Sequence, residues 1–162
     1  MPFNERNERK KMNQIPTLYN GELYLDERGT VAFVNDFKFE NVKRFYIVSN
    51  HRVGFARDWH GHKTEFKCAM VISGAALIAA VAIDNWKNPS KDEKVYRYNL
   101  SAHKPMVLFI PKGYANNFMA LTENTRVMFL SNLSVEESRN DDYRYDADYW
   151  NPWVIQGGKK VI

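Results

Sequence analysis

Two histidines and a lysine lie close together in the segment 57–74. His60 and His62 are separated by one residue, and Lys67 follows five residues later. Successive side chains of a β-strand point to opposite faces, so both imidazoles are expected on the same face. A turn or bulge after His62 would bring the lysine round to that side. Histidine transfers protons near neutral pH and a fixed ammonium stabilises a developing oxyanion, so the segment predicts a proton-transfer site.

The elements that must position this site are short β-prone runs separated by turn signals. Cys68 to Ile72 is apolar and closes at Ser73-Gly74, which predicts a buried strand ending in a turn. Helical periodicity occurs only at 134–139, where a Ser-x-x-Glu capping pattern predicts one turn. Many short strands without alternating helices predict an all-β barrel or sandwich. The predicted strands cover 22–25, 31–34, 44–48, 53–59, 67–72, 75–83, 95–100, 106–110, 114–121 and 126–130.

The chain of 162 residues predicts one folded domain, residues 16–162, preceded by a polar, charged arm, residues 1–15. The tail from Tyr143 to Trp153 carries five large aromatic rings in eleven residues. So many rings are unfavourable in water, so we expect this tail to pack over the barrel or a partner.

The composition predicts a soluble cytoplasmic protein. The single cysteine, Cys68, excludes an intrachain disulfide framework. No apolar signal segment begins the chain, and the longest mostly apolar stretch, 69–83, is too short to span a bilayer. The net charge of +4 is mild, and the basic residues form no dense stripe, so neither a nucleic acid nor a membrane is predicted as a partner.

The spacing of the site residues resembles the first motif of cupins, His-x-His followed by an acidic residue and a glycine, with Lys67 at the acidic position and Gly74 at the glycine. A second cupin motif resembles 111–116, with Asn116 at the position of its histidine. The resemblance implies a cupin jelly-roll barrel, or double-stranded β-helix. An ammonium at ~4 Å would repel a divalent cation by several kcal/mol, and Glu65 lies two residues too early, so we predict no metal and no other cofactor.

Further motifs are similar to those of the dTDP-4-dehydrorhamnose 3,5-epimerases and the related sugar 3,4-ketoisomerases. The epimerase motif Arg-Gly-Leu-His resembles Arg57-Asp58-Trp59-His60, and the segment 109–118 resembles a second one. The ketoisomerase motif Lys-Arg-x-Tyr-Tyr-Ile resembles 43–47, and its Arg-Gly-x-His-Ala-His-Lys resembles 57–63. The resemblance covers residues 42–132, and it implies epimerisation beside the ketone of a nucleotide-linked 4-keto-deoxy sugar in surface polysaccharide synthesis.

The resemblance and the chemistry together give each residue an expected role. His60 is the base, Lys67 stabilises the enolate, and His62 or Tyr46 is the second proton carrier. Arg57 binds the substrate phosphates, and Asn116 is also expected to contact the substrate. The expected partners are the nucleotide-sugar substrate and a second copy of the chain, because such sheets protect their edges by pairing.

Three departures from the epimerase pattern leave other functions open. Phe129 lies where the epimerases have a catalytic tyrosine, Asn116 replaces a histidine, and no late aspartate is evident to orient the catalytic histidine. A single epimerisation remains open, as does a 3,4-ketoisomerisation of the same substrates. A non-catalytic sugar-binding cupin is the alternative from another class.

Overall fold

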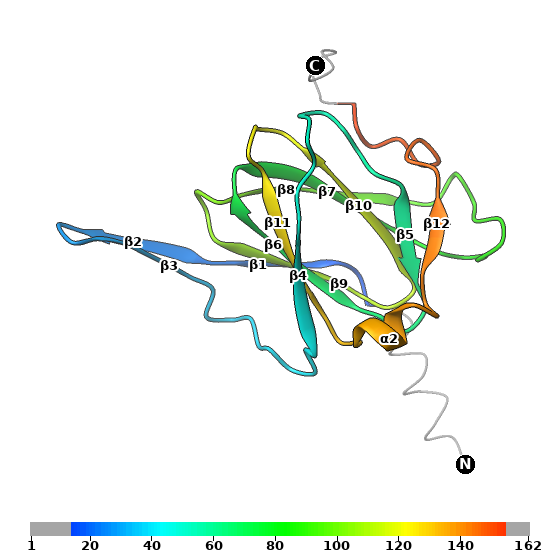
Figure 1. Cartoon of the computed structure of the whole chain (residues 1–162), viewed down its shortest axis with the longest axis horizontal. Helices are drawn as coiled ribbons and strands as arrows, with labels where there is room; N and C mark the ends of the chain where they lie inside the picture. The colour runs from blue at the N-terminus through cyan, green and yellow to red at the C-terminus, as the bar shows by residue number, and fades with distance from the viewer. Residues whose placement is uncertain (1–13, 155–162) are drawn as a thin grey trace.

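The computed structural model describes residues 14–154, which form a cupin-like jelly roll of two five-stranded antiparallel sheets (Figure 1). The predicted fold class is therefore confirmed. In the first sheet the strand order is β1 (Thr17–Asn20), β9 (Met106–Ile110), β6 (Lys67–Ser73), β11 (Arg126–Ser131) and β4 (Arg44–Val48). In the second sheet it is β12 (Tyr143–Tyr145), β5 (Trp59–His62), β10 (Tyr114–Ala120), β7 (Ala75–Ala82) and β8 (Val95–Ser101).

Two further elements complete the fold. A hairpin of β2 (Glu22–Asp26) and β3 (Gly29–Phe33) projects from the barrel (Figure 1). The short helix α2 (Val135–Ser138) lies between β11 and β12. Ser134 caps it, and Glu137 completes a capping box, so the predicted helical turn is confirmed.

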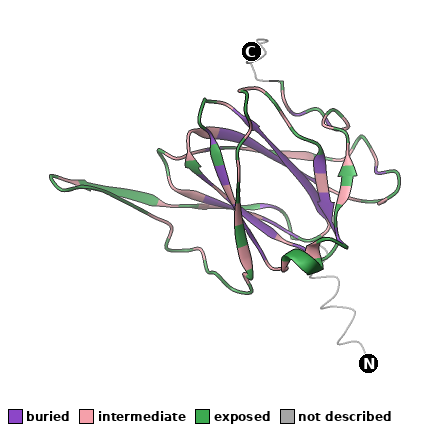
Figure 2. Cartoon of the chain, in the orientation of Figure 1, coloured by how far each residue is buried: buried purple, intermediate pink, exposed green. Residues whose placement is uncertain are grey.

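The main core lies between the two sheets, and β7 shows how the apolar pattern builds it. Ala76, Ile78 and Ala80 are fully buried in this core, together with residues of β6, β9, β10 and β11. On the other face of β7, Ala79 and Val81 are equally buried. A strand covered on both faces has a continuous apolar sequence, which is why 75–83 lacks alternation. Figure 2 shows the same burial along the central strands.

The aromatic tail covers the outer face of the second sheet, where Ala79 and Val81 lie. Trp150 packs edge-on against Trp59 with 5.3 Å between ring centroids, and both are almost completely buried. The indole of Trp59 donates to the carbonyl of Ala147 at 3.0 Å, and that of Trp150 donates to Ser90 at 2.9 Å. The prediction that this tail packs on the barrel is confirmed, and it buries the strand that carries both histidines.

The turn between β5 and β6 positions the chemistry, because these strands belong to different sheets. Residues 63–66 carry the chain across the barrel, so Lys67 begins a strand that faces the histidines. At the far end of β6, Gly74 has φ +71°, and a Cβ there would lie 2.5 Å from the hydroxyl of Thr122. Glycine is therefore required at the turn into β7.

The structure differs from the prediction at 53–59, where a strand was expected. Gly54 has φ +76°, which breaks the extended backbone, and β5 begins only at Trp59. Within residues 14–154, no helix is long and apolar enough to cross a membrane. The N-terminal arm predicted for residues 1–15 lies almost entirely outside the described residues.

Candidate active site

A cavity of about 170 Å³ lies between the two sheets. Of the six predicted site residues, His62 is not among those that line it, and the other five are. The lining comprises Tyr46, Val48, Lys67 and Phe129 from the first sheet, His60, Asn116, Asn117 and Phe118 from the second, and Arg57 from the loop before β5.

His60 is oriented by a carboxylate from the C-terminal part of the chain. Its Nδ1 lies 2.9 Å from Oδ1 of Asp142, which immediately precedes β12. The carboxylate can only accept, so the proton of neutral His60 is on Nδ1 and the lone pair is on Nε2. Burial lowers the pKa of His60, although Asp142 partly opposes this effect. His60 is therefore a neutral base at pH 7.

Asp142 is itself held in the ionised form. Arg144 donates from Nε to its other oxygen, Oδ2, at 3.0 Å. Burial alone would raise the pKa of Asp142, but the hydrogen bonds from Arg144 and His60 outweigh it and lower the pKa. The expectation that no aspartate orients the histidine is thus wrong. Asp142 is 82 residues from His60, and only the pairing of β12 with β5 brings them together.

Lys67 presents a buried amine to the cavity. Its Nζ lies 5.8 Å from the ring centroids of both Tyr46 and Phe129. Within residues 14–154, this amine forms neither a hydrogen bond nor an ion pair with another side chain. Burial lowers the pKa of Lys67 to about 8, and Glu65 is the strongest of the charges that oppose the shift. At pH 7 the cavity therefore contains an ammonium that can bind an oxyanion.

An aromatic wall stands on the side of β4 and β11. Tyr46 stacks on Phe129 with 5.4 Å between centroids and 20° between planes, and Phe118 lies against the same ring. Burial raises the pKa of Tyr46 above its usual range. The phenol is therefore protonated at neutral pH and can donate a proton.

His62 lies beside His60, as the alternation of β5 predicts, with 6.5 Å between ring centroids and 23° between planes. Its Nδ1 lies 2.6 Å from the carbonyl oxygen of Asp141 and 3.0 Å from Oε2 of Glu65. Both partners accept, so the proton of His62 is also on Nδ1. The side chain is 5 % exposed and lies behind the lining of the cavity.

Asp141 fastens the turn between β5 and β6. Its carboxylate accepts from the backbone N–H groups of Lys63, Thr64 and Glu65 at 2.7, 2.9 and 2.8 Å. Burial alone would raise the pKa of Asp141, and these bonds outweigh it and lower the pKa. Two consecutive aspartates therefore hold both histidines and the turn that leads to the lysine.

Asn116 and Asn117 hold the backbone around the base. Asn116 lies opposite His60 in the ladder and donates from Nδ2 to its carbonyl at 3.3 Å, while the amide of Asn117 donates to the carbonyl of Arg57. Asn116, at the position of a cupin histidine, thus lines the cavity and braces β5. Sequence reasoning missed Asn117, whose only signal was its place next to Asn116 in a buried strand.

Comparison with known proteins identifies the family. The family model described as dTDP-4-dehydrorhamnose 3,5-epimerase matches residues 17–154, which is most of the chain. The chain belongs to this family. No curated protein matches it significantly.

Solved epimerase structures share the fold. The dTDP-4-dehydrorhamnose 3,5-epimerase of Sulfolobus tokodaii is 25% identical with a TM-score of 0.68, covering 87% of this chain and 82% of its own. The Bacillus anthracis epimerase, solved with TDP and pyrophosphate, is 21% identical with a TM-score of 0.66, covering 88% and 87%. The 3,4-ketoisomerase QdtA of Thermoanaerobacterium thermosaccharolyticum, in complex with TDP, is 18% identical with a TM-score of 0.64, covering 85% and 93%.

Membership of the epimerase family makes the chain an enzyme of the epimerase and isomerase class. Lys67 lies beside the histidines at the position where metal-binding cupins have a carboxylate. In the described part of the chain, no three His, Cys, Asp or Glu side chains are grouped so as to hold a metal ion. Glu65, considered from the sequence as a substitute ligand, is turned toward Nδ1 of His62 and toward Arg44.

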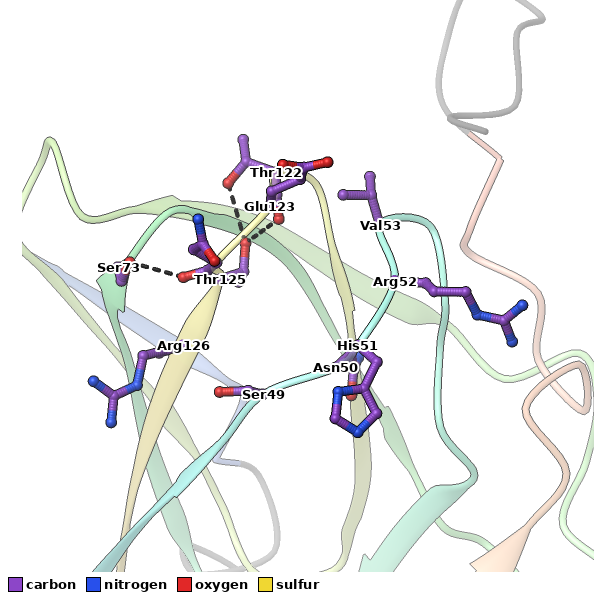
Figure 3. Close-up of a pocket in the computed structure, with 11 residues that line it drawn as sticks. Ser49, Asn50, His51, Arg52, Val53, Ser73, Thr122, Glu123, Thr125 and Arg126 are labelled. Carbon is purple, nitrogen blue, oxygen red and sulfur yellow. Dashed lines mark hydrogen bonds between the residues drawn. The ribbon is translucent and has the colours of Figure 1, made fainter.

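The cavity is smaller than several hollows elsewhere on the described surface, and two of them bear on the assignment of the site. One of about 490 Å³ shares His60 and Arg57 with it and adds His51, Phe55 and Arg144. The other, of about 840 Å³, has Arg52 and Arg126 on opposite sides and contains neither His60 nor Lys67 (Figure 3). Its lining includes His51 beside Arg52, but five of the six predicted site residues line the smaller space, so the chemistry is assigned there.

Proposed function

We propose that this protein epimerises a carbon next to the ketone of a nucleotide-linked 4-keto-6-deoxyhexose. One observation carries the proposal: His60, held by Asp142, and the buried amine of Lys67 line the same cavity. A carbon beside a ketone becomes acidic when its enolate is stabilised, and these two groups supply the base and the cation.

The proposed reaction has two proton transfers. Nε2 of His60 removes the proton on the carbon beside C4, and the electrons of the broken C–H bond form an enolate whose oxygen faces Lys67. A proton delivered from the other side of the sugar then restores the ketone and inverts the carbon. Tyr46 is the proposed donor, because it comes from the opposite sheet to His60 and its phenol is protonated.

A 3,4-ketoisomerisation is the second candidate. It moves the proton on C3 to C4 and the hydroxyl proton on O3 to O4, and it does not require an acid on the opposite side of the ring. The absence of a hydroxyl on Phe129 favours it, because the described aromatic side of the cavity then has a single phenol, that of Tyr46. The TDP-bound ketoisomerase among the structural neighbours is consistent with this alternative.

The nucleotide diphosphate is proposed to lie in the adjoining hollow of about 490 Å³. Arg57 lines both spaces, so it can bind phosphate while the sugar contacts His60. Arg144 adds a second guanidinium there, and Phe55 offers an aromatic ring. TDP is the nucleotide of several neighbours, which makes dTDP the first nucleotide to test.

The decisive experiment incubates the purified protein with dTDP-4-keto-6-deoxyglucose in deuterated water and follows the sugar by NMR. Epimerisation places deuterium at C3 or C5, with inversion, while the ketone remains at C4. Ketoisomerisation moves the ketone to C3. Binding of the sugar nucleotide without any exchange would support the non-catalytic alternative, and the His60→Asn variant serves as the blank.

A homodimer is also proposed, supported by the projecting hairpin. A two-stranded hairpin alone is marginally stable in water, and this one exposes Leu23, Tyr24, Leu25 and Val31. A second copy of the chain would cover these side chains. Light scattering after size exclusion should give twice 19.0 kDa. The double variant Leu25→Lys, Val31→Lys should shift the protein to the monomer, and a monomeric wild type would contradict the proposal.

A further inference from the structure

Glu65 is a buried acid that the proposed mechanism does not use. Its side chain is 1 % exposed, and it lies in the turn between β5 and β6, outside the lining of the cavity. An ionised carboxylate is costly to bury unless cations and hydrogen-bond donors surround it. Its partners therefore indicate what it does.

Three donors from three elements converge on this carboxylate. Arg44 of β4 lies 3.3 Å from Oε1, and the hydroxyl of Ser131 at the end of β11 donates to the same oxygen. The other oxygen, Oε2, lies 3.0 Å from Nδ1 of His62. Arg44 is fixed in turn by the carbonyl of Leu133 at 3.0 Å. The carboxylate therefore joins both sheets behind the cavity.

His62 depends on this arrangement. Its Nδ1 faces the carbonyl of Asp141 and Glu65, and its Nε2 is buried without a hydrogen-bond partner among the described residues. Loss of the Glu65 carboxylate would remove one of the two acceptors that hold the proton on Nδ1. His62 acts only through its neighbours, because it does not line the cavity.

The same carboxylate acts on two cations. Lys67, which is buried, lies two residues after Glu65 in the chain, and the half-buried Arg44 lies 3.3 Å from Oε1 of Glu65. The charged and titratable groups that act on the amine of Lys67 are Arg44 from β4, Glu65 from the turn, and Asp141 and Asp142 before β12. His60 and His62 are the neighbouring imidazoles on β5, and the ring centroid of Tyr46 on β4 lies 5.8 Å from Nζ. Among these, Glu65 is the strongest influence that favours the charged amine.

We propose that Glu65 is a positioning residue that keeps the amine of Lys67 protonated, by balancing the charge of Arg44, and keeps the proton of His62 on Nδ1. It contacts no substrate. Without it, the ammonium of Lys67 would lose the strongest charge that favours it, while the repulsion from Arg44 would remain. This inference rests on the proposed function for its catalytic readout only.

The test substitutes Glu65→Gln, which preserves shape and removes the charge. The exchange rate of the substrate proton is measured against pH, and the Nζ resonance of Lys67 is titrated by 15N NMR. We expect the alkaline limb of the rate profile and the Nζ titration both to move down by about one pH unit, a tenfold change in proton affinity. The acid limb, set by His60, should shift much less.

Two further variants keep the outcome unambiguous. Glu137→Gln is the matched control, because it neutralises an exposed carboxylate paired with Lys43 and should shift neither curve. Glu65→Asp retains the charge and should restore most of the wild-type profile. If Glu65→Gln folds and leaves the titration of Lys67 unchanged, the inference is overturned. If the wild type exchanges no proton, the proposed function fails, while the NMR titration still tests Glu65.

Discussion

The two sides of the cavity differ in what they can do with a proton. On the side of β5 and β12, His60 is held by Asp142, and the other oxygen of Asp142 accepts from Arg144. On the side of β4 and β11, Tyr46 and Phe129 stack, and one phenol is the only proton donor of the described wall. The base, His60, is therefore held by a chain of polar contacts, whereas the opposite side offers the phenol of Tyr46 as its acid.

This asymmetry separates the two candidate reactions. Inversion needs an acid opposite the base, whereas transfer between neighbouring carbons can be carried out from one side. Lys67 serves both reactions, because each passes through an enolate. The side chains around His60 therefore decide whether any reaction occurs, and the aromatic wall decides which product forms.

The largest expected effect comes from removing the base. His60→Asn should lower the rate of proton exchange by about 10²–10⁴-fold, the usual contribution of a positioned general base. The solvent deuterium exchange of a 4-keto sugar nucleotide measures it. His103→Asn, an exposed histidine in the turn before β9, is the control and should retain full activity. Unchanged exchange in His60→Asn would transfer the role of base to another group.

Removing the cation should reduce activity slightly less than removing the base. Lys67→Met should reduce kcat/KM by about 10²–10³-fold, because one preorganised stabiliser of the oxyanion is lost. The loss should fall mainly on kcat, since the ammonium matters most when charge develops on the oxygen. Lys104→Met, an exposed lysine, serves as the matched control. An effect confined to KM would mean that Lys67 binds substrate without stabilising the enolate.

The same substitution should stabilise the fold. The pKa of Lys67 is lowered from 10.5 to about 8, so burying the ammonium at pH 7 opposes folding by roughly 3 kcal/mol. Lys67→Met should therefore raise the free energy of unfolding in urea by about that amount. Because the pKa is lower in the folded state, the unfolded chain binds more protons between pH 8 and 10.5. The stability of the wild type should therefore rise relative to that of the variant over this range. A destabilised variant would argue that packing outweighs charge here.

The sequence predicted most of the strands and one part of the site, but it did not predict β1 or β12. Ladder strands such as β4 and β9 follow from β-branched and aromatic runs, and the His-x-His spacing placed both imidazoles on one face. The position of Asp142 could not be predicted, because β12 has only three residues and pairs with a strand about 80 positions away. Its partner β5 was predicted at the wrong position. The expected strand at 53–59 overlaps β5 only at Trp59, since Gly54 breaks the extended backbone.

Roles that depend on burial could not be predicted from the sequence either. His62 has the same residue type and strand face as His60, yet the turn fastened by Asp141 places it behind the cavity. Glu65 looked like a misplaced metal ligand because the sequence does not show that Arg44 faces it from another strand. Local spacing indicates which residues share a face, whereas the packing of β4 and β12 determines their chemistry.

A substitution on the aromatic wall tests the comparison directly. Tyr46→Phe should lower the rate of inversion by about 10–100-fold, while removal of the substrate proton persists, because the base is intact. The ratio of deuterium exchange with retention to exchange with inversion measures this by NMR. Tyr24→Phe, on the exposed hairpin, is the control. If inversion and exchange fall together, Tyr46 is not the opposite acid; if neither falls, the reaction needs only one side.

The smallest expected effect is the dependence of the rate on pH. Burial lowers the pKa of His60 below its usual 6.5, so the neutral base is lost only as the pH falls through that lowered value. Lys67 loses its proton as the pH rises through about 8. The profile of kcat/KM should therefore be bell-shaped, with its maximum near neutrality and about a tenfold change for each pH unit on either limb.

Two variants test which group sets each limb of the pH–rate profile. Asp142→Asn removes the carboxylate that raises the pKa of His60, so its acid limb should move to lower pH, with a lower maximal rate because the imidazole tautomer is no longer fixed. The residual activity of Lys67→Met should lack the alkaline limb near pH 8. If that limb survives in Lys67→Met, a group other than the amine titrates there, and the cation on which both candidate reactions depend must be sought elsewhere in the cavity.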